Sequence, residues 1–204
     1  MSLSKAYAIV LYAPVLDADI SVPLHPIDRY NEVLRCQNQR ARIEKYLVWK
    51  LLEKAVTKYL KLDFANLEFT KTENGQWLSP SFCFSLSHTD GLVCVAVSDA
   101  PIGVDAELVR GIRPELDVRI LTERELGAVR GMAKEDKERF LLEAWVKKES
   151  IFKKSGGKAL LPNRIELDAH SVLTERVVCQ GREYIIAVCQ DRDTEIEFYF
   201  TEEI

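Results

Sequence analysis

The chain is poor in the residues and patterns that mark several common protein classes. It has only three histidines, and none of its five cysteines forms a C-x-x-C pair, so the sequence disfavours a zinc site and predicts free thiols in apolar surroundings. No stretch approaches the roughly 18 apolar residues of a membrane span. Neither G-x-x-x-x-G-K nor G-x-G-x-x-G occurs, which excludes the common phosphate-binding loops.

A basic excess is also missing, since the 204 residues carry a net charge of −4. Proteins that bind nucleic acid without sequence preference normally carry a positive excess, so we expect no nucleic-acid partner. The first residues, with a short apolar stretch at Ala6–Ala13, are more typical of a strand than of a signal sequence. We expect a cytoplasmic enzyme or binding protein with no membrane association, and 47% hydrophobic residues are enough to fill its core.

Hydrophobic periodicity predicts the same order of elements twice. The first series is a strand at 6–13, a helical pattern over 28–60 that breaks near 36–39, and a hairpin of strands 82–87 and 92–97 turning at 88–91. The second series is a strand at 102–108, a short helix from the capping box of Thr122 and Glu125 to about Gly131, a helix over 135–154 stopped by Gly156, and strands near 175–179 and 183–190. A last strand alternates through 196–200.

Helix followed by hairpin therefore occurs in both parts of the chain. We predict an α+β fold of two similar halves, residues 1–101 and 102–204, packed closely as a pseudo-dimer because no low-complexity linker divides them. Fusion of two halves would place a shared site within one chain, which favours a monomer.

The strand Ile102–Leu108 carries two carboxylates among apolar residues. Side chains alternate across a strand and residues rise roughly 3.3 Å each, so Asp105 and Glu107 point the same way about 7 Å apart at Cα. Two such carboxylates can share one hard cation. The alternative is an ordinary half-buried strand with a solvated polar face.

Three further features can carry chemistry. Helical spacing places Glu149 and Lys153 beside Trp145, either as site residues or as a common surface salt bridge. His88 follows Ser87 at the predicted hairpin turn, where it either donates hydrogen bonds to a phosphate or is an exposed turn histidine. Two basic clusters form either solvated helix faces or phosphate contacts: Lys147, Lys148, Lys153, Lys154 and Lys158, and Arg35, Arg40, Arg42 and Lys45.

The order of three motifs resembles a known family. Ser85-Leu-Ser-His88, then Ile102-Gly-Val-Asp-Ala-Glu107, then Trp145 through Pro162 is similar to the 4′-phosphopantetheinyl transferases, in particular the surfactin-synthetase-activating type. The resemblance implies two similar α+β halves. It also implies transfer of the 4′-phosphopantetheine arm of coenzyme A, the co-substrate, to a serine of an acyl or peptidyl carrier protein, with Mg²⁺ as cofactor and adenosine 3′,5′-bisphosphate as product.

The same resemblance implies roles for individual residues. Asp105, Glu107 and Glu149 correspond to the metal ligands, and Glu149 also to the residue that takes the proton from the attacking serine. Lys153 corresponds to the phosphate-binding lysine. Ser87, His88 and Arg40 correspond to contacts with coenzyme A.

The chain departs from the family pattern at two places. Gly75-Gln76-Trp77 stands where many relatives have Gly-Lys-Pro, and Gly156-Gly-Lys-Ala-Leu160 stands where they have Gly-Lys-Gly-Leu. The first departure removes a lysine that would face coenzyme A, so Gln76 takes its place as a candidate contact.

Two other functions use the same residues. A carrier-protein-binding module would keep the fold without the reaction and dock an acidic carrier on the basic stretch after Lys147. A metal-dependent phosphodiesterase acting on nucleotides would use the same carboxylates with water as the nucleophile.

Overall fold

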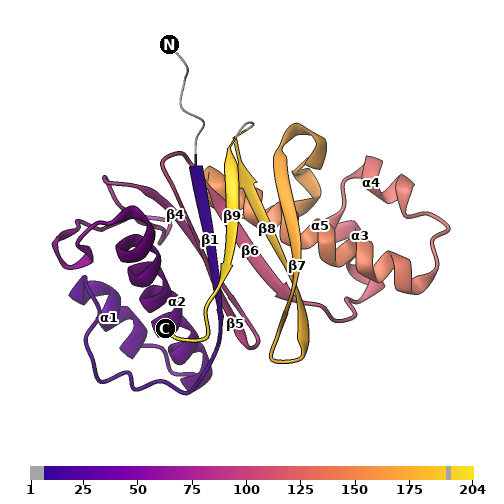
Figure 1. Cartoon of the computed structure of the whole chain (residues 1–204). Coiled ribbons are helices and arrows are strands. Elements are labelled where there is room, and N and C mark those ends of the chain that lie inside the picture. The colour runs from indigo at the N-terminus through magenta and orange to yellow at the C-terminus, as the bar shows by residue number, and fades with distance from the viewer. Residues whose placement is uncertain (1–6, 192–193) are drawn as a thin grey trace, which may run out of the picture.

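The computed structural model describes residues 7–191 and 194–204. Two sheets pack face to face between helices, with α1 (Ile27–Leu34) and α2 (Gln39–Ala55) on one side and α5 (Lys134–Ser155) on the other (Figure 1). The predicted first strand began at Ala6, which lies outside the described residues.

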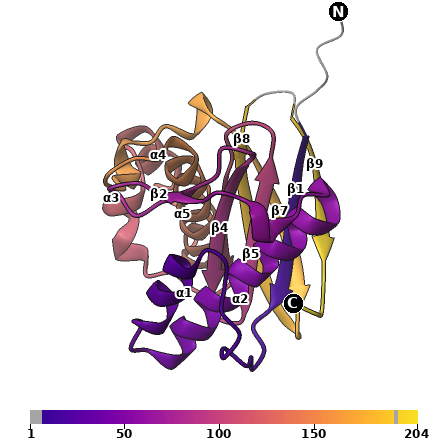
Figure 2. The same cartoon turned by 90° about the vertical axis from the view of Figure 1, so that its left-hand side faces the viewer.

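The first sheet has four strands in the order β4-β5-β1-β9. Their bounds are β1 (Tyr7–Pro14), β4 (Cys83–Thr89), β5 (Leu92–Ser98) and β9 (Glu195–Phe200). Strand β1 is antiparallel to β5 and parallel to β9. Helices α1 and α2 cover the outer face of this sheet (Figure 2), and a π-helical turn at Val56–Leu60 follows α2.

The second sheet has three antiparallel strands in the order β6-β8-β7. Their bounds are β6 (Gly103–Leu108), β7 (Ser171–Cys179) and β8 (Arg182–Gln190). Helix α5 packs on the outer face of this sheet, beside the short helices α3 (Asp117–Ile120) and α4 (Glu123–Ala128). The small hairpin of β2 (Thr70–Lys71) and β3 (Trp77–Leu78) is separate from both sheets, and short 3₁₀ turns lie at Phe64–Asn66, Pro114–Leu116, Pro162–Arg164 and Leu167–Ala169.

Strand alternation builds a core on each face of the first sheet. On β1, Ile9 and Leu11 pack with α2, whereas Ala8 and Val10 pack against the second sheet. Every residue of β5 is buried because both of its faces are covered, which explains its continuous apolar sequence.

Most of the predicted elements are confirmed. The α+β class, the break between α1 and α2 and the capping box of Thr122 and Glu125 are all present, and α5 ends at Gly156 with a φ of +64°. The predicted turn at 88–91 is wrong at its start: β4 continues through Thr89 because His88 and Thr89 pair with Val93 and Leu92. Only Asp90 and Gly91 remain in the turn.

The two halves share one topology. Each has a strand, a long helix and a hairpin, and in each sheet the second hairpin strand lies between the first strand and the first hairpin strand. Strand β9 falls outside this repeat, since it follows residue 101 in the chain yet joins the first sheet. The division into 1–101 and 102–204 stays a prediction, and β9 crosses it.

The prediction of free thiols is confirmed in the described part of the chain. All five cysteines are free, and Cys94, Cys179 and Cys189 are buried. None of the described helices has both the length and the apolar character needed to cross a membrane.

Candidate functional site

The site begins where the edge strand β4 of the first sheet meets the edge strand β6 of the second. Two serine hydroxyls join these strands: the amide of Val104 donates to Ser85 Oγ at 3.0 Å and the amide of Ala106 donates to Ser87 Oγ at 3.1 Å. Both serines are buried. Side-chain hydroxyls of β4 thus accept hydrogen bonds from β6 amides. In a continuous sheet the backbone carbonyls of a neighbouring strand would accept them.

The same face of β4 fixes both carboxylates of β6. Ser87 Oγ donates to Asp105 Oδ1 at 2.8 Å, and Thr89 Oγ1 donates to Glu107 Oε2 at 3.0 Å. Asp105 is only 5% exposed, so the alternative of a solvated strand face is wrong. Sequence reasoning missed Ser85 and Thr89 as partners of this strand. Their signal is the alternation of hydroxyl residues at 85, 87 and 89 on a strand that is otherwise largely apolar.

Gly103 lets α5 come close to this strand. A Cβ at Gly103 would lie 2.0 Å from the carbonyl oxygen of Ser150 and 2.5 Å from the amide nitrogen of Lys154. Only a residue without a side chain fits there, and the contact sets the last turns of α5 against β6.

Lys153 reaches across this contact to the carboxylate strand. Its Nζ donates to Asp105 Oδ1 at 2.7 Å and to Ser87 Oγ at 3.2 Å. Lys153 is thus paired with Asp105, and the alternative of a surface bridge from Glu149 to Lys153 is wrong. The Ser87 hydroxyl is fully used by Asp105, Ala106 and Lys153.

The charges of both strand carboxylates act on Glu149. Burial raises the pKa of Glu149, the charges of Asp105 and Glu107 raise it further, and Lys153 opposes them. Burial likewise raises the pKa of Glu107, with the Asp105 charge adding to it and Thr89 opposing it. The charges of these partly or fully buried carboxylates therefore act on one another, offset by Lys153 at Asp105 and Glu149 and by Arg110 at Glu107.

These carboxylates meet part of what a metal ion requires. Within residues 7–191 and 194–204, no three His, Cys, Asp or Glu side chains form a ready-made metal-binding group. Yet Asp105 Oδ2 is a buried oxygen with no hydrogen-bond partner among the described residues, and the charges of Asp105 and Glu107 raise the pKa of Glu149. Oxygen ligands of this kind fit a hard divalent cation, with further ligands supplied by substrate or water.

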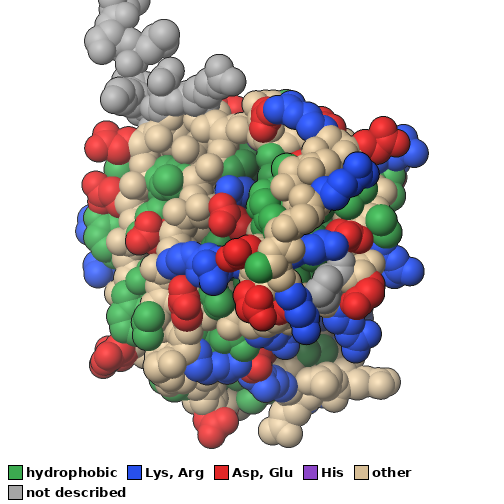
Figure 3. Space-filling model, turned by 90° about the vertical axis from the view of Figure 1, so that its right-hand side faces the viewer, with side chains coloured by type: hydrophobic (Ala, Val, Ile, Leu, Met, Phe, Trp, Pro, Cys, Tyr) green, Lys and Arg blue, Asp and Glu red, His purple; other side chains and the backbone are tan. Residues whose placement is uncertain are grey.

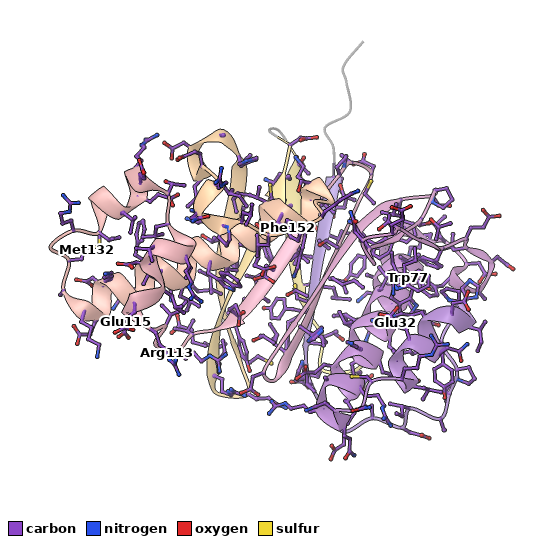
Figure 4. The ribbon with its side chains drawn as sticks, turned by 180° about the vertical axis from the view of Figure 1, so that it is seen from behind. Glu32, Trp77, Arg113, Glu115, Met132 and Phe152 are labelled. Atoms are coloured by element: carbon purple, nitrogen blue, oxygen red, sulfur yellow. The ribbon has the colours of Figure 1, made fainter. Side chains whose placement is uncertain are left out.

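A cavity of about 520 Å³ opens beside Lys153, between α5 and the first half. Figure 4 shows Phe152 of α5 on one side of this cavity and Trp77 and Glu32 on the opposite side. Its basic lining residues are Arg29, Lys45, His88, Lys153 and Lys158. Three predicted coenzyme A contacts, His88, Gln76 and Lys153, line this cavity, whereas Ser87 and Arg40 are not among its lining residues.

Gln76 lies in the β2–β3 hairpin, which connects the two halves beside the cavity. Its Nε2 donates to the carbonyl of Lys153 at 3.4 Å, and Asn74 Nδ2 donates to the carbonyl of Gly156 at 3.3 Å. On the other side, Lys71 Nζ and Trp77 Nε1 donate to Glu32 Oε2 at 2.7 and 3.1 Å. The amide of Gln76 thus contacts the end of α5.

His88 and Arg40 are connected through one acidic residue. His88 Nδ1 lies 3.2 Å from Glu44 Oε2, and Arg40 Nε donates to Glu44 Oε1 at 3.3 Å. Arg40 also pairs with Asp90 in the hairpin turn. Burial lowers the pKa of His88, Glu44 opposes this effect, and Lys153 and Lys45 lower the pKa further.

The lysine stretch of α5 is not one uniform surface. Lys148 is fully buried and pairs with Glu125 and the carbonyl of Ile120, so its prediction as a solvated or phosphate-binding residue is wrong. Lys147 and Lys154 pair with Glu143 and Asp191. Figure 3 shows that the face formed by α3, α4 and α5 mixes both signs of charge.

Comparison with known proteins points to one family. The family model described as the 4′-phosphopantetheinyl transferase superfamily matches residues 101–198. This range includes Asp105, Glu107, Glu149 and Lys153, and it leaves out β4 and α2 of the first half.

Individual relatives carry the same name. The 4′-phosphopantetheinyl transferase Sfp of Bacillus subtilis (strain 168) is 27% identical over 125 residues, which cover 60% of this chain and 54% of the relative. The 4′-phosphopantetheinyl transferase gsp of Aneurinibacillus migulanus is 27% identical over 126 residues, 61% of this chain and 53% of the relative. A 4′-phosphopantetheinyl transferase of Bacillus subtilis is 26% identical over 68% of this chain and 70% of its own length. The chain spans about half the length of the first two relatives.

Proposed function

We propose that this protein is a 4′-phosphopantetheinyl transferase of the surfactin-synthetase-activating type. It moves the phosphopantetheine arm of coenzyme A to a serine hydroxyl of an acyl or peptidyl carrier protein. The observation that carries the proposal is the meeting of Asp105 and Glu107 on β6 with Glu149 and Lys153 on α5, next to a cavity with basic lining. The family match over the same four residues supports it.

Asp105, Glu107 and Glu149 would hold a divalent cation, which we propose is Mg²⁺. Mg²⁺ usually takes a few carboxylates and completes its coordination with substrate phosphate and water. When bound, the ion neutralises charge on the pyrophosphate of coenzyme A. The hydroxyls of Ser87 and Thr89 keep the two strand carboxylates in fixed orientations, which is the usual task of groups behind metal ligands.

The chain's own residues account for the remaining steps. His88 and Lys153 bind phosphate oxygens in the cavity, where Lys153 offsets charge on the leaving group. Glu149 takes the proton from the serine hydroxyl as the general base. The serine oxygen then bonds to phosphorus, and the pyrophosphate P–O bond breaks. Adenosine 3′,5′-bisphosphate leaves with the electron pair of that bond.

The predicted pseudo-dimer, the monomeric state and the cytoplasmic location belong to the same proposal. The repeated topology of the two sheets supports the pseudo-dimer. In this arrangement the cavity and the carboxylates lie within one chain, which supports a monomer.

The test is a mass-shift assay. Purified protein, coenzyme A, Mg²⁺ and a panel of apo carrier proteins should give carriers heavier by one phosphopantetheine arm, and EDTA should stop the reaction. Asp105→Ala and Glu149→Gln should abolish transfer. Glu143→Gln, on the same helix and paired with Lys147, is the matched control and should keep the wild-type rate.

Other outcomes would replace the proposal. Hydrolysis of coenzyme A without a carrier would identify a metal-dependent phosphodiesterase. Tight carrier binding in calorimetry, without coenzyme A and without turnover in the mass assay, would identify a carrier-binding module. Wild-type transfer by Glu149→Gln would remove Glu149 from the site.

A further inference from the structure

Glu44 is an acidic residue inside the first half that the roles above leave unused. It lies on α2, is only 8% exposed and has one carboxylate oxygen 3.2 Å from His88 Nδ1. Its other oxygen accepts from Arg40 Nε at 3.3 Å. A buried carboxylate held between an imidazole and a guanidinium fixes the position of both groups.

Strand alternation separates His88 from the carboxylate site. Ser87 and Thr89 point toward β6, and His88 between them points to the other face of β4, toward α2 and the cavity. The His88 side chain is 35% exposed, and its Nδ1 is taken by Glu44. In the described part of the chain no hydrogen bond involves His88 Nε2. This nitrogen is therefore the atom with which His88 can bind a ligand.

A series of ion pairs holds Glu44 in place through Arg40. Arg40 pairs with Asp90 in the β4–β5 turn, and Asp90 accepts two hydrogen bonds from Arg182 at the start of β8, at 3.3 and 2.8 Å. This series of ion pairs runs from the second sheet through the β4–β5 turn and α2 to the cavity. The carboxylate of Glu44 thus reaches His88 from a fixed direction.

We propose that Glu44 is a positioning residue that lets His88 bind phosphate as an imidazolium, with one proton taken up from solvent on binding. Neutral His88 with its proton on Nδ1, donated to Glu44, offers only a lone pair at Nε2 and repels a phosphate oxygen. Protonation of Nε2 from water or buffer turns that nitrogen into a donor, and the resulting cation lies between Glu44 and the phosphate. The inference rests on the proposed function and adds a residue outside the range matched by the family model.

The charges around His88 support this behaviour. Glu44 and Lys45 face it from α2, and Lys153 faces it from α5. Burial and the two lysines lower the pKa of His88 and Glu44 opposes them, which favours the neutral imidazole before a ligand binds. A phosphate in the cavity adds negative charge beside Nε2 and favours the protonated form.

The test is calorimetry with adenosine 3′,5′-bisphosphate in metal-free buffers of different ionisation enthalpy at pH 7.5. Wild type should take up close to one proton per ligand bound. Glu44→Gln keeps an acceptor of the same shape but lacks the charge, so affinity should fall about tenfold and proton uptake should fall with it. Glu53→Gln, on the same helix and paired with Lys50, is the control and should match wild type.

A measurement on the unmodified protein keeps the inference testable if Glu44→Gln does not fold. Nitrogen NMR of the three histidines, with the His88 signals assigned from His88→Gln, should show a neutral Nδ1–H ring that becomes imidazolium on ligand addition. Ligand binding without proton uptake, or equal uptake in Glu44→Gln, overturns the inference and leaves the proposed transferase intact. No ligand binding by wild type also overturns the inference, whereas the transferase itself is decided by the mass-shift assay with Mg²⁺.

Discussion

Strands β1 and β6 hold the same place in their sheets but carry opposite chemistry. Each is the first strand of its half and pairs with the second strand of its hairpin. When the two hairpins are superimposed by their similar runs from Leu92 and Tyr184, Asp105 and Glu107 fall on Leu11 and Ala13. In β1 these helix-facing positions are core. The candidate site is thus built from positions that the other half uses for packing.

The edge of each strand that faces away from its hairpin explains how β6 tolerates its carboxylates. The edge of β1 is closed by a full backbone ladder with β9, whereas the edge of β6 meets β4 through the hydroxyls of Ser85 and Ser87. Hydroxyls can donate to carboxylates as well as accept from amides, and a backbone ladder leaves no such donors. The polar site therefore depends on an edge that no strand has closed.

Helices α2 and α5 also differ in the polarity of a fully buried side chain. Fully buried Trp49 fills the core under α2, and fully buried Lys148 lies in α5. Burial of an ammonium group requires a partner of opposite charge, which Glu125 provides.

Breaking that ion pair should give the largest loss of stability. We expect Lys148→Met to lower the free energy of unfolding by about 3–5 kcal/mol, because Glu125 is left charged without its partner. Urea denaturation measures it. Lys147→Met, which removes a partly exposed pair, should cost less than about 1 kcal/mol. Equal small losses in both variants would show that Lys148 is solvated.

Gly103→Ala should have the next largest effect. The added Cβ meets backbone atoms of α5, which cannot move without shifting the helix, so a loss of about 1–3 kcal/mol is expected. Gly127→Ala in α4 is the control, since a Cβ added there meets no atom of the described residues within 4 Å outside its own helix backbone, and helix propensity favours alanine. Thermal unfolding of both variants compares them. A neutral Gly103→Ala would contradict the close contact.

Lys153→Met tests whether the ammonium group at Asp105 competes with a divalent cation. Lys153 neutralises Asp105 in the metal-free protein, so its removal should let Mn²⁺ bind about tenfold more tightly without coenzyme A. Electron paramagnetic resonance of free Mn²⁺ measures this. Lys154→Met, which removes only the pair with Asp191, should bind Mn²⁺ as wild type does. Weaker binding by Lys153→Met would show that the lysine does not compete with the cation.

Thr89→Val should have the smallest effect on stability, about 1 kcal/mol. Its hydroxyl stabilises the charged form of Glu107, so the variant should raise the pKa of Glu107 above its already raised value. A protonated Glu107 stabilises the fold below its ordinary pKa, and this contribution disappears as pH rises through the raised pKa. Carboxyl-carbon NMR of wild type and variant checks the direction. An unchanged or lower pKa would contradict the role of Thr89.

Sequence patterns located most elements because their causes are local. Alternation marked the strands, a capping box marked the start of α4, and Gly156 marked the end of α5. The turn at Asp90–Gly91 was placed two residues early, because the polar residues His88 and Thr89 look like turn residues but belong to a strand edge. The environment of Lys148 was missed because burial of a lysine depends on a partner far away in the chain.

The amino-acid sequence alone predicts the α+β class, the repeated order of elements and the residue types that can bind a cation and phosphate. Periodicity and turn chemistry act over a few residues, so they can be read along the chain. Three features follow from long-range packing: β9 joins the first sheet, Ser87 and Thr89 orient the two carboxylates, and Glu44 contacts His88. These contacts join segments far apart in sequence, and packing of the two sheets and their helices brings them together.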